Sequence, residues 1–179
     1  GYALLEPDQS IVLQDAPSLS QQGMAFTTWF RLLDSTNTNR VLFHQGPVAE
    51  SAIEVGINAN NYFYVKFGDA APKVCSLTPS DLDMAVPQDA WCFVGLGLNW
   101  TETQDEIELL LLTPDSPDPL VAVENVPDTI HFDTQGDIHI GNAPHGDTPW
   151  RGMLRDVRLW NAPKEYLELA VDRSTRVRS

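Results

Sequence analysis

The amino-acid sequence predicts an all-β protein, built as a two-sheet antiparallel sandwich with one short helix near the C-terminus. Apolar and polar residues alternate in many short segments, which is typical of strands that bury one face. Pro (13) and Gly (11) punctuate the chain, and turn-forming residues recur at the short intervals found in β-sandwiches. With 179 residues, the chain is long enough for one domain with a substantial core and too short for two comfortable ones.

Period-two alternation predicts about ten strands. The clearest covers residues 152–160, where Leu154 shares a face with Arg158 while Arg155 and Val157 take the opposite face. The complete set of expected strands is residues 10–14, 25–33, 40–44, 52–57, 62–67, 91–100, 107–112, 120–123, 137–140 and 152–160.

A single segment, residues 163–171, is typical of a helix. Pro163 suits a first turn, and Tyr166, Leu167 and Ala170 form one apolar stripe. We therefore expect one domain over residues 1–171, followed by a basic tail or linker stub at residues 172–179.

Charge is distributed unevenly along the chain, which has a formal net charge of −14. Between Val74 and Trp150 there are fourteen Asp and Glu and no Lys or Arg, and seven of the eleven basic residues lie from Arg151 onward. An acidic body repels nucleic acid and anionic membranes, so neither is expected as a partner. No apolar run approaches the roughly 20 residues of a membrane helix. The absence of a basic-plus-apolar leader fits a processed or excised piece, or a cytosolic protein.

The chain contains two cysteines, Cys75 and Cys92. Cys92 lies in the apolar run Trp-Cys-Phe-Val, where a buried free thiol acting as a small hydrophobe is one interpretation. The other is a disulfide, which would close a modest loop and contribute about 3 kcal/mol. We expect the two cysteines to be close enough to bridge. No Cys/His cluster indicates a zinc or redox site.

Several short motifs follow one another in a characteristic order. They are residues 24–30 (MAFTTWF), 41–46 (VLFHQG), 89–94 (DAWCFV), 137–142 (DIHIGN) and 150–161 (WRGMLRDVRLWN). This order resembles the laminin-G-like jelly rolls of the concanavalin A-like lectin and glucanase superfamily. The resemblance implies a jelly-roll fold and a binding module more readily than an enzyme. It also implies an extracellular or cell-surface location and a glycan or extracellular protein as partner.

The loop over residues 142–151 is the first candidate site, because it links two strands that carry the resemblance. It offers Asn142, His145, Asp147, Trp150 and Arg151, a mixture that suits a polyol stacked on the indole. The alternative is that Trp150 seals the end of the core. Tyr62 and Tyr64 form a second candidate platform, or else a cross-strand aromatic pair on the sheet surface.

Calcium is the candidate cofactor. Oxygen-rich loops supply Asp34, Asn37 and Asp147 as candidate ligands. The resemblance implies such a site, because laminin-G-like relatives often hold calcium at a loop rim. The alternative is that these residues only form turns.

Catalysis has one candidate, the pair Glu106 and Glu108. Glycosidases on this sandwich use three acids on one strand face, and here the third position is Leu110. We therefore expect no enzyme activity. The first functional hypothesis is glycan recognition at the loop rim, with calcium as the candidate cofactor; the second is protein adhesion or assembly, and a glycosidase comes third.

Overall fold

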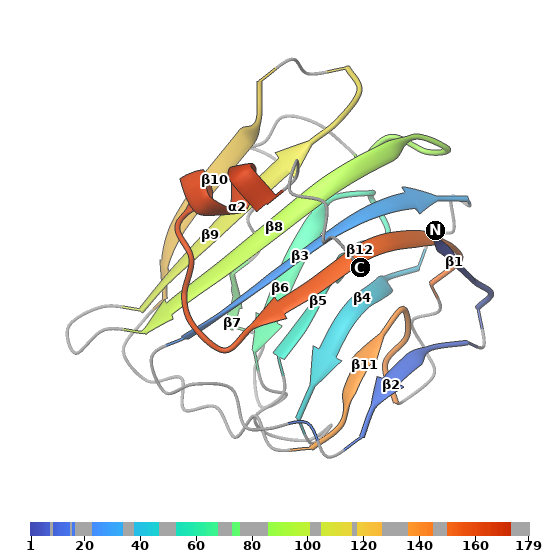
Figure 1. Ribbon diagram of the computed structural model, residues 1–179, viewed down its shortest axis with the longest axis horizontal. Coiled ribbons are helices and arrows are strands. Elements are labelled where there is room, and N and C mark those ends of the chain that lie inside the picture. The colour runs from blue at the N-terminus through green and yellow to red at the C-terminus, as the bar shows by residue number, and fades with distance from the viewer. Residues whose placement is uncertain are drawn as a thin grey trace.

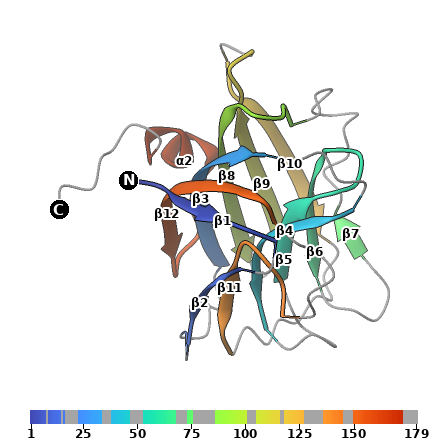
Figure 2. The ribbon, with the colours of Figure 1, turned by 90° about the vertical axis from the view of Figure 1, so that its right-hand side faces the viewer.

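The computed structural model describes residues 1–7, 9–14, 16, 23–33, 38–46, 53–67, 73–75, 86–100, 105–115, 118–126, 136–144 and 150–172. In this part of the chain, twelve strands form two six-stranded antiparallel sheets that face each other, with one short helix (Figures 1 and 2). The predicted all-β sandwich is therefore confirmed.

The two sheets are named A and B. Sheet A has the order β1 (Ala3–Leu5), β12 (Gly152–Trp160), β3 (Gly23–Leu32), β8 (Trp91–Trp100), β9 (Asp105–Leu112) and β10 (Leu120–Val126). Sheet B has the order β2 (Ile11–Leu13), β11 (Ile138–Ile140), β4 (Arg40–Gln45), β5 (Ile53–Ile57), β6 (Phe63–Phe67) and β7 (Lys73–Cys75). The helix is α2 (Tyr166–Asp172).

All ten expected strands are present, with ends that shift by a few residues. No strand was predicted at β1 or β7, which have three residues each; β2 and β11 are equally short but lie inside longer predicted segments, residues 10–14 and 137–140. The helix begins three residues later than expected. Glu165 precedes it, and the Glu165 carbonyl accepts hydrogen bonds from the backbone amides of Glu168 and Leu169, both at 3.0 Å.

The main core lies between the two sheets. It is rich in aromatic contacts that join β3 to sheet B: Phe26 lies 5.2 Å from Phe43 and Phe30 lies 5.5 Å from Phe63, measured between ring centroids. Burying such rings is the main favourable term in assembling a sandwich. In β3 the inward residues, Phe26 and Phe30, are ones that alternation places on one face.

A second apolar cluster lies on the outer face of sheet A, beneath α2. Its buried members are Ala25, Phe93, Leu110, Leu112 and Leu169. The helix contacts β8 and β9, and so covers one half of this face (Figure 1). The half over β1, β12 and β3 lies away from the helix.

Strand β12 contains a bulge that corrects the expected face assignment. Arg155 pairs with Trp29, but Arg158 pairs with Thr27, so three steps along β12 match two along β3. Asp156 adopts a φ of 52° at this point. Because one residue is inserted, the side-chain alternation reverses. Arg158 therefore shares the outer face with Arg155, whereas Val157 packs against the core.

No helix among the described residues is long and apolar enough to span a membrane. The expected tail over residues 172–179 lies almost wholly outside the described part of the chain, so the domain boundary stays a prediction.

Candidate functional site

Trp150, the expected sugar platform, is fully buried. Its side chain is 0% exposed and meets Phe30 edge-to-face, with 5.9 Å between the ring centroids. The Trp150 amide donates to the carbonyl of Gly141 at 3.2 Å, which fixes the entry of the chain into β12. A sugar cannot stack on a ring that is enclosed by the core. The prediction of Trp150 as a ligand-binding residue is wrong, and the alternative that it seals the core is correct.

The described residues at the two ends of the rim loop contact the N-terminal segment. Asn142 is half-buried and its Nδ2 donates to the carbonyl of Pro7 at 3.4 Å. Arg151 is exposed and forms an ion pair with Glu6, with 3.5 Å between Nε and Oε2. His145 and Asp147 lie outside the described residues. The binding roles of these four residues stay predictions.

Tyr64 does not form an exposed platform. It is 6% exposed, and its hydroxyl donates to Oε1 of Glu54 at 2.7 Å. Burial, reinforced by the charge of Glu54 and by this hydrogen bond, raises the pKa of Tyr64 well above its usual range. Tyr62 is half-buried just before β6. The prediction of Tyr64 as a sugar-stacking residue is wrong, because its side chain is buried and its hydroxyl is bound to Glu54.

The outer face of sheet B also carries two histidines. His139 lies opposite His44 in the register of β11 and β4, with 6.2 Å between the ring centroids. His139 faces away from the buried Ile138 and Ile140, as predicted. His44 is buried although it lies on the outer face. His44 and Tyr64 are both buried, so the outer face of sheet B is covered at these two positions.

The predicted calcium ligands Asp34, Asn37 and Asp147 all lie outside the described residues. Within the described ranges, no group of three His, Cys, Asp or Glu side chains is placed to hold a metal ion. The calcium site therefore stays a prediction.

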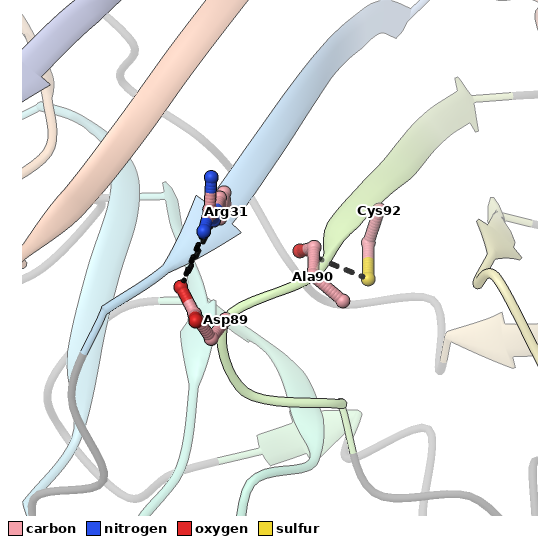
Figure 3. Close-up of polar contacts among 4 residues, drawn as sticks. All are labelled: Arg31, Asp89, Ala90 and Cys92. Atoms are coloured by element: carbon pink, nitrogen blue, oxygen red, sulfur yellow. Dashed lines mark hydrogen bonds and ion pairs between the residues drawn. The ribbon is translucent and has the colours of Figure 1, made fainter.

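Cys92 is a free, fully buried thiol. Its Sγ lies 3.8 Å from the carbonyl oxygen of Ala90 and points into the core between the sheets (Figure 3). This contradicts the expected bridge to Cys75, whose side chain lies outside the described part. Cys92 instead acts as a small core hydrophobe, the alternative that the sequence left open. Burial, with a smaller contribution from the charge of Asp115, raises the pKa of the Cys92 thiol to about 12.

The acidic pair Glu106 and Glu108 lies on the outer face of β9, beside the buried Ile107 and Leu109, as predicted. The third position, Leu110, is buried beneath α2. The pair contributes to a pocket of about 170 Å³ between α2 and sheet A. Its lining residues are Gly97, Asn99, Glu106, Glu108, Pro163, Lys164, Glu165 and Glu168. The glutamates thus face a polar recess, but no third acid stands beside them on the strand.

A cluster on this face of β3, β8 and β12 was not predicted from the sequence. Trp29, Trp91 and Trp160 are all half-buried on the outer face of sheet A. The guanidinium carbon of Arg155 lies 5.0 Å from the ring centroid of Trp29 and 4.6 Å from that of Trp91. We call Trp29, Trp91 and Arg155 the indole–guanidinium cluster. The sequence pattern that could have revealed the cluster is the alternation in β3, which places Trp29 on the face opposite to that of Phe26 and Phe30.

Strand order assembles this cluster. Arg155 on β12 pairs with Trp29 on β3, and Trp29 pairs with Phe93 on β8, two residues after Trp91. The Trp29 ring also packs on Phe93, with 5.4 Å between centroids. The cluster is therefore held from three adjacent strands by a fixed register.

An ion pair borders the cluster. Arg31 on β3 contacts Oδ1 of Asp89 through both Nε at 3.0 Å and a terminal nitrogen at 2.7 Å (Figure 3). Asp89 is positioned by its own amide, which donates to the carbonyl of Leu32 at 2.8 Å. The Arg31 guanidinium is thus engaged, whereas Nε of Arg155 is buried without an acceptor among the described residues.

Comparison with solved structures identifies the fold. The chain superposes on domains LG4-5 of the mouse laminin α1 chain with a TM-score of 0.61 and 15% identity, covering 90% of this chain and 43% of that one. For a sialidase module from Ruminococcus gnavus described as CBM40, the TM-score is 0.60, the identity 10%, and the coverage 92% and 96%. For a heptameric SAP-like pentraxin from Limulus polyphemus, the TM-score is 0.62 and the identity 11%, and the match covers 94% of this chain and 79% of that one.

The chain therefore has the laminin-G-like jelly-roll fold, as the sequence motifs implied. No family model and no curated protein matches the sequence. At these identities the comparisons establish the fold, and function has to be argued from the residues of the chain itself.

Proposed function

We propose that this domain is a non-catalytic glycan-binding module of an exported or cell-surface protein, and that it holds sugar on the indole–guanidinium cluster. One observation carries the proposal: two half-buried indoles lie beside a guanidinium on the outer face of sheet A. The similarity to a module described as CBM40, over 96% of that chain, supports a compact domain of this kind as a binding unit.

The chemistry of the cluster suits a sugar. Indole faces and edges pack against the apolar C–H faces of a sugar ring, and a guanidinium donates hydrogen bonds to its oxygens. Binding sites combine such apolar surface with a few polar groups that fix orientation. Because the cluster is held by strand register rather than by a loop, it is ordered before the ligand arrives, which lowers the cost of binding.

A glycan array tests the proposal with two matched variants. We expect Trp91→Ala to lose binding, whereas Trp160→Ala retains it. Trp160 is also a half-buried indole on the outer face with a cation over its ring, Lys164 at 4.4 Å, but it lies outside the cluster. Equal binding by wild type and Trp91→Ala to every bound glycan would refute this site. Arrays run with calcium and with EDTA test whether calcium at a loop rim assists.

Protein adhesion is the second candidate function. Four large apolar side chains are exposed on the edge strands β1 and β2 or next to them: Tyr2, Leu4, Val12 and Leu13. Open edges with apolar side chains suit pairing with another chain. If adhesion is the function, protein-coated beads should aggregate, and the double variant Leu4→Lys, Val12→Lys should disperse them. If beads coated with the wild-type protein stay dispersed, homotypic adhesion through these edges is ruled out.

Glycoside hydrolysis is not part of the proposal. Retention needs two carboxyl groups roughly 5–5.5 Å apart with distinct roles, and the strand that carries Glu106 and Glu108 has Leu110 at its third position. We expect no release of reducing sugar from β-glucans. Turnover that disappears in Glu106→Gln would contradict the binding-module proposal.

A further inference from the structure

We infer that the glycan is anionic and that Arg155 binds its carboxylate or sulfate group. This inference rests on the proposed function and names the ligand class for the same cluster. The starting point is an imbalance of charge. The chain has 25 acidic residues against 11 Lys and Arg, yet Arg155 has no acidic partner among the described residues.

The neighbouring arginines show that this is unusual. Arg31 is held by Asp89 at 2.7 Å and Arg151 lies 3.5 Å from Glu6. Arg155 instead contacts two rings, and its backbone carbonyl accepts a hydrogen bond from Thr28 Oγ1 at 3.2 Å. A half-buried guanidinium without a counter-ion carries a desolvation cost, which ring contacts offset only in part.

An oxyanion would complete this environment. The planar guanidinium presents a fork of N–H donors that matches a carboxylate or sulfate in geometry, and such charge-assisted pairs are stronger than neutral hydrogen bonds. The contacts with Trp29 and Trp91 restrict the orientation of the fork and limit its hydration. A neutral sugar hydroxyl would satisfy the same donors with much less energy.

The local charge favours an anion here and opposes it elsewhere. Arg31, Arg155 and Arg158 all lie on the outer face of two adjacent strands, β3 and β12. The segment from Val74 to Trp150 contains no basic residue. Repulsion by the distant acids is screened beyond roughly 8 Å at physiological salt, so the short-range arginine contacts decide where an anionic sugar binds.

The test compares matched glycans on wild-type protein, each with and without sialic acid or sulfate. The neutral and charged glycans of the pair with the strongest array signal are then titrated against the protein. Where no pair stands out, lactose, sialyllactose and sulfated lactose are titrated. We expect the charged member to bind about 10- to 100-fold more tightly than the neutral one, the range for a charge-assisted contact. The sialylated and sulfated arms distinguish a carboxylate from a sulfate ligand.

Variants then locate the charge. Arg155→Gln should remove the preference for the charged glycan, and Arg155→Lys should restore only part of it because the fork is lost. Lys164→Gln removes one positive charge beside Trp160, outside the cluster, and should keep the preference. Thermal melts of each variant separate lost binding from lost folding.

Two failures are distinguishable. If no glycan binds at all, the proposed function fails. If glycans bind through Trp91 but the neutral members bind as well as the charged ones, the anion assignment alone is overturned. That second outcome needs only the wild-type protein and Trp91→Ala, so it stands even if Arg155 variants do not fold.

Discussion

Leu169 of helix α2 packs directly on Gly95 of strand β8. A Cβ placed on Gly95 would lie 3.0 Å from Cβ of Leu169, and one placed on Gly97 would collide with the backbone carbonyl oxygen of Lys164. The helix therefore docks at a position where β8 has no side chains, and Leu169 fills the space that two glycines leave.

The two glycines should differ in their tolerance of a methyl group. In Gly97→Ala the methyl meets a backbone atom, so we expect a loss of about 1–3 kcal/mol in the free energy of unfolding. In Gly95→Ala it meets Cβ of Leu169 at 3.0 Å, a milder overlap that a shift of the helix by a few tenths of an ångström relieves, so the loss should be smaller. Urea unfolding of the two variants measures the order, and a larger loss in Gly95→Ala would contradict this packing.

Trp150→Ala should destabilise the protein strongly, because the ring is fully enclosed against Phe30. We expect a loss of about 3–5 kcal/mol, the range for a buried aromatic residue. Trp91→Ala is the matched control, since it removes a half-buried indole and one cation–π contact at a cost of about 1 kcal/mol. Equal losses in chemical denaturation would show that Trp150 is not the core residue described above.

Tyr64→Phe should change how stability depends on alkaline pH. The pKa of Tyr64 is raised in the folded state, so its contribution is fully present below the unfolded value of about 10 and is lost as the pH rises above it. Below pH 9 we expect wild type to be more stable than Tyr64→Phe by about 1.5–3 kcal/mol, because Glu54 loses a hydrogen bond.

Between pH 10 and pH 11 that advantage should shrink by about 1 kcal/mol, and the slope should approach about 1.4 kcal/mol per pH unit above pH 11. Urea midpoints of both proteins across this range give the difference. Cys92 also titrates under alkaline conditions when unfolded, but it is present in both proteins and cancels. A difference that stays constant with pH would rule out the buried pair.

Cys92 should be inert in the native protein and reactive once unfolded. Burial raises the pKa of its thiol to about 12, so almost no thiolate is present at neutral pH. We expect no alkylation of Cys92 under native conditions and full alkylation in denaturant without reductant, followed by peptide mass spectrometry. Labelling that appears only after reduction would restore the disulfide to Cys75.

Local alternation predicted most of the fold because a strand with one buried face shows its period in a few residues. Trp29 alternates with Phe26 and Phe30, and it lies on the outer face while they lie in the core. Strands β1 and β7 have three residues each and were not predicted, whereas the equally short β2 and β11 lie inside longer predicted segments.

The candidate site was harder to predict because it depends on strand order. Arg155, Trp29 and Trp91 lie far apart in the sequence and meet only because β12, β3 and β8 are adjacent. Trp150 shows the same limit in reverse. The local sequence around a Trp between a loop and a strand does not reveal whether its ring is exposed or buried. Trp150 is buried because its ring packs on Phe30, which is distant in the sequence.

The bulge at Asp156 gives β12 two halves of opposite phase. Up to Arg155 the side chains of odd-numbered residues point outward, and after the bulge those of even-numbered residues do. A single strand therefore shows two polar–apolar patterns. Deleting Asp156 would leave Val157 and Leu159 toward the core and Arg158 and Trp160 outward, because two steps along β12 would then match two along β3. A regular strand that kept Asp156 without the bulge would instead turn Val157 and Leu159 toward solvent, so the bulge lets β12 carry one more residue without changing which side chains face the core.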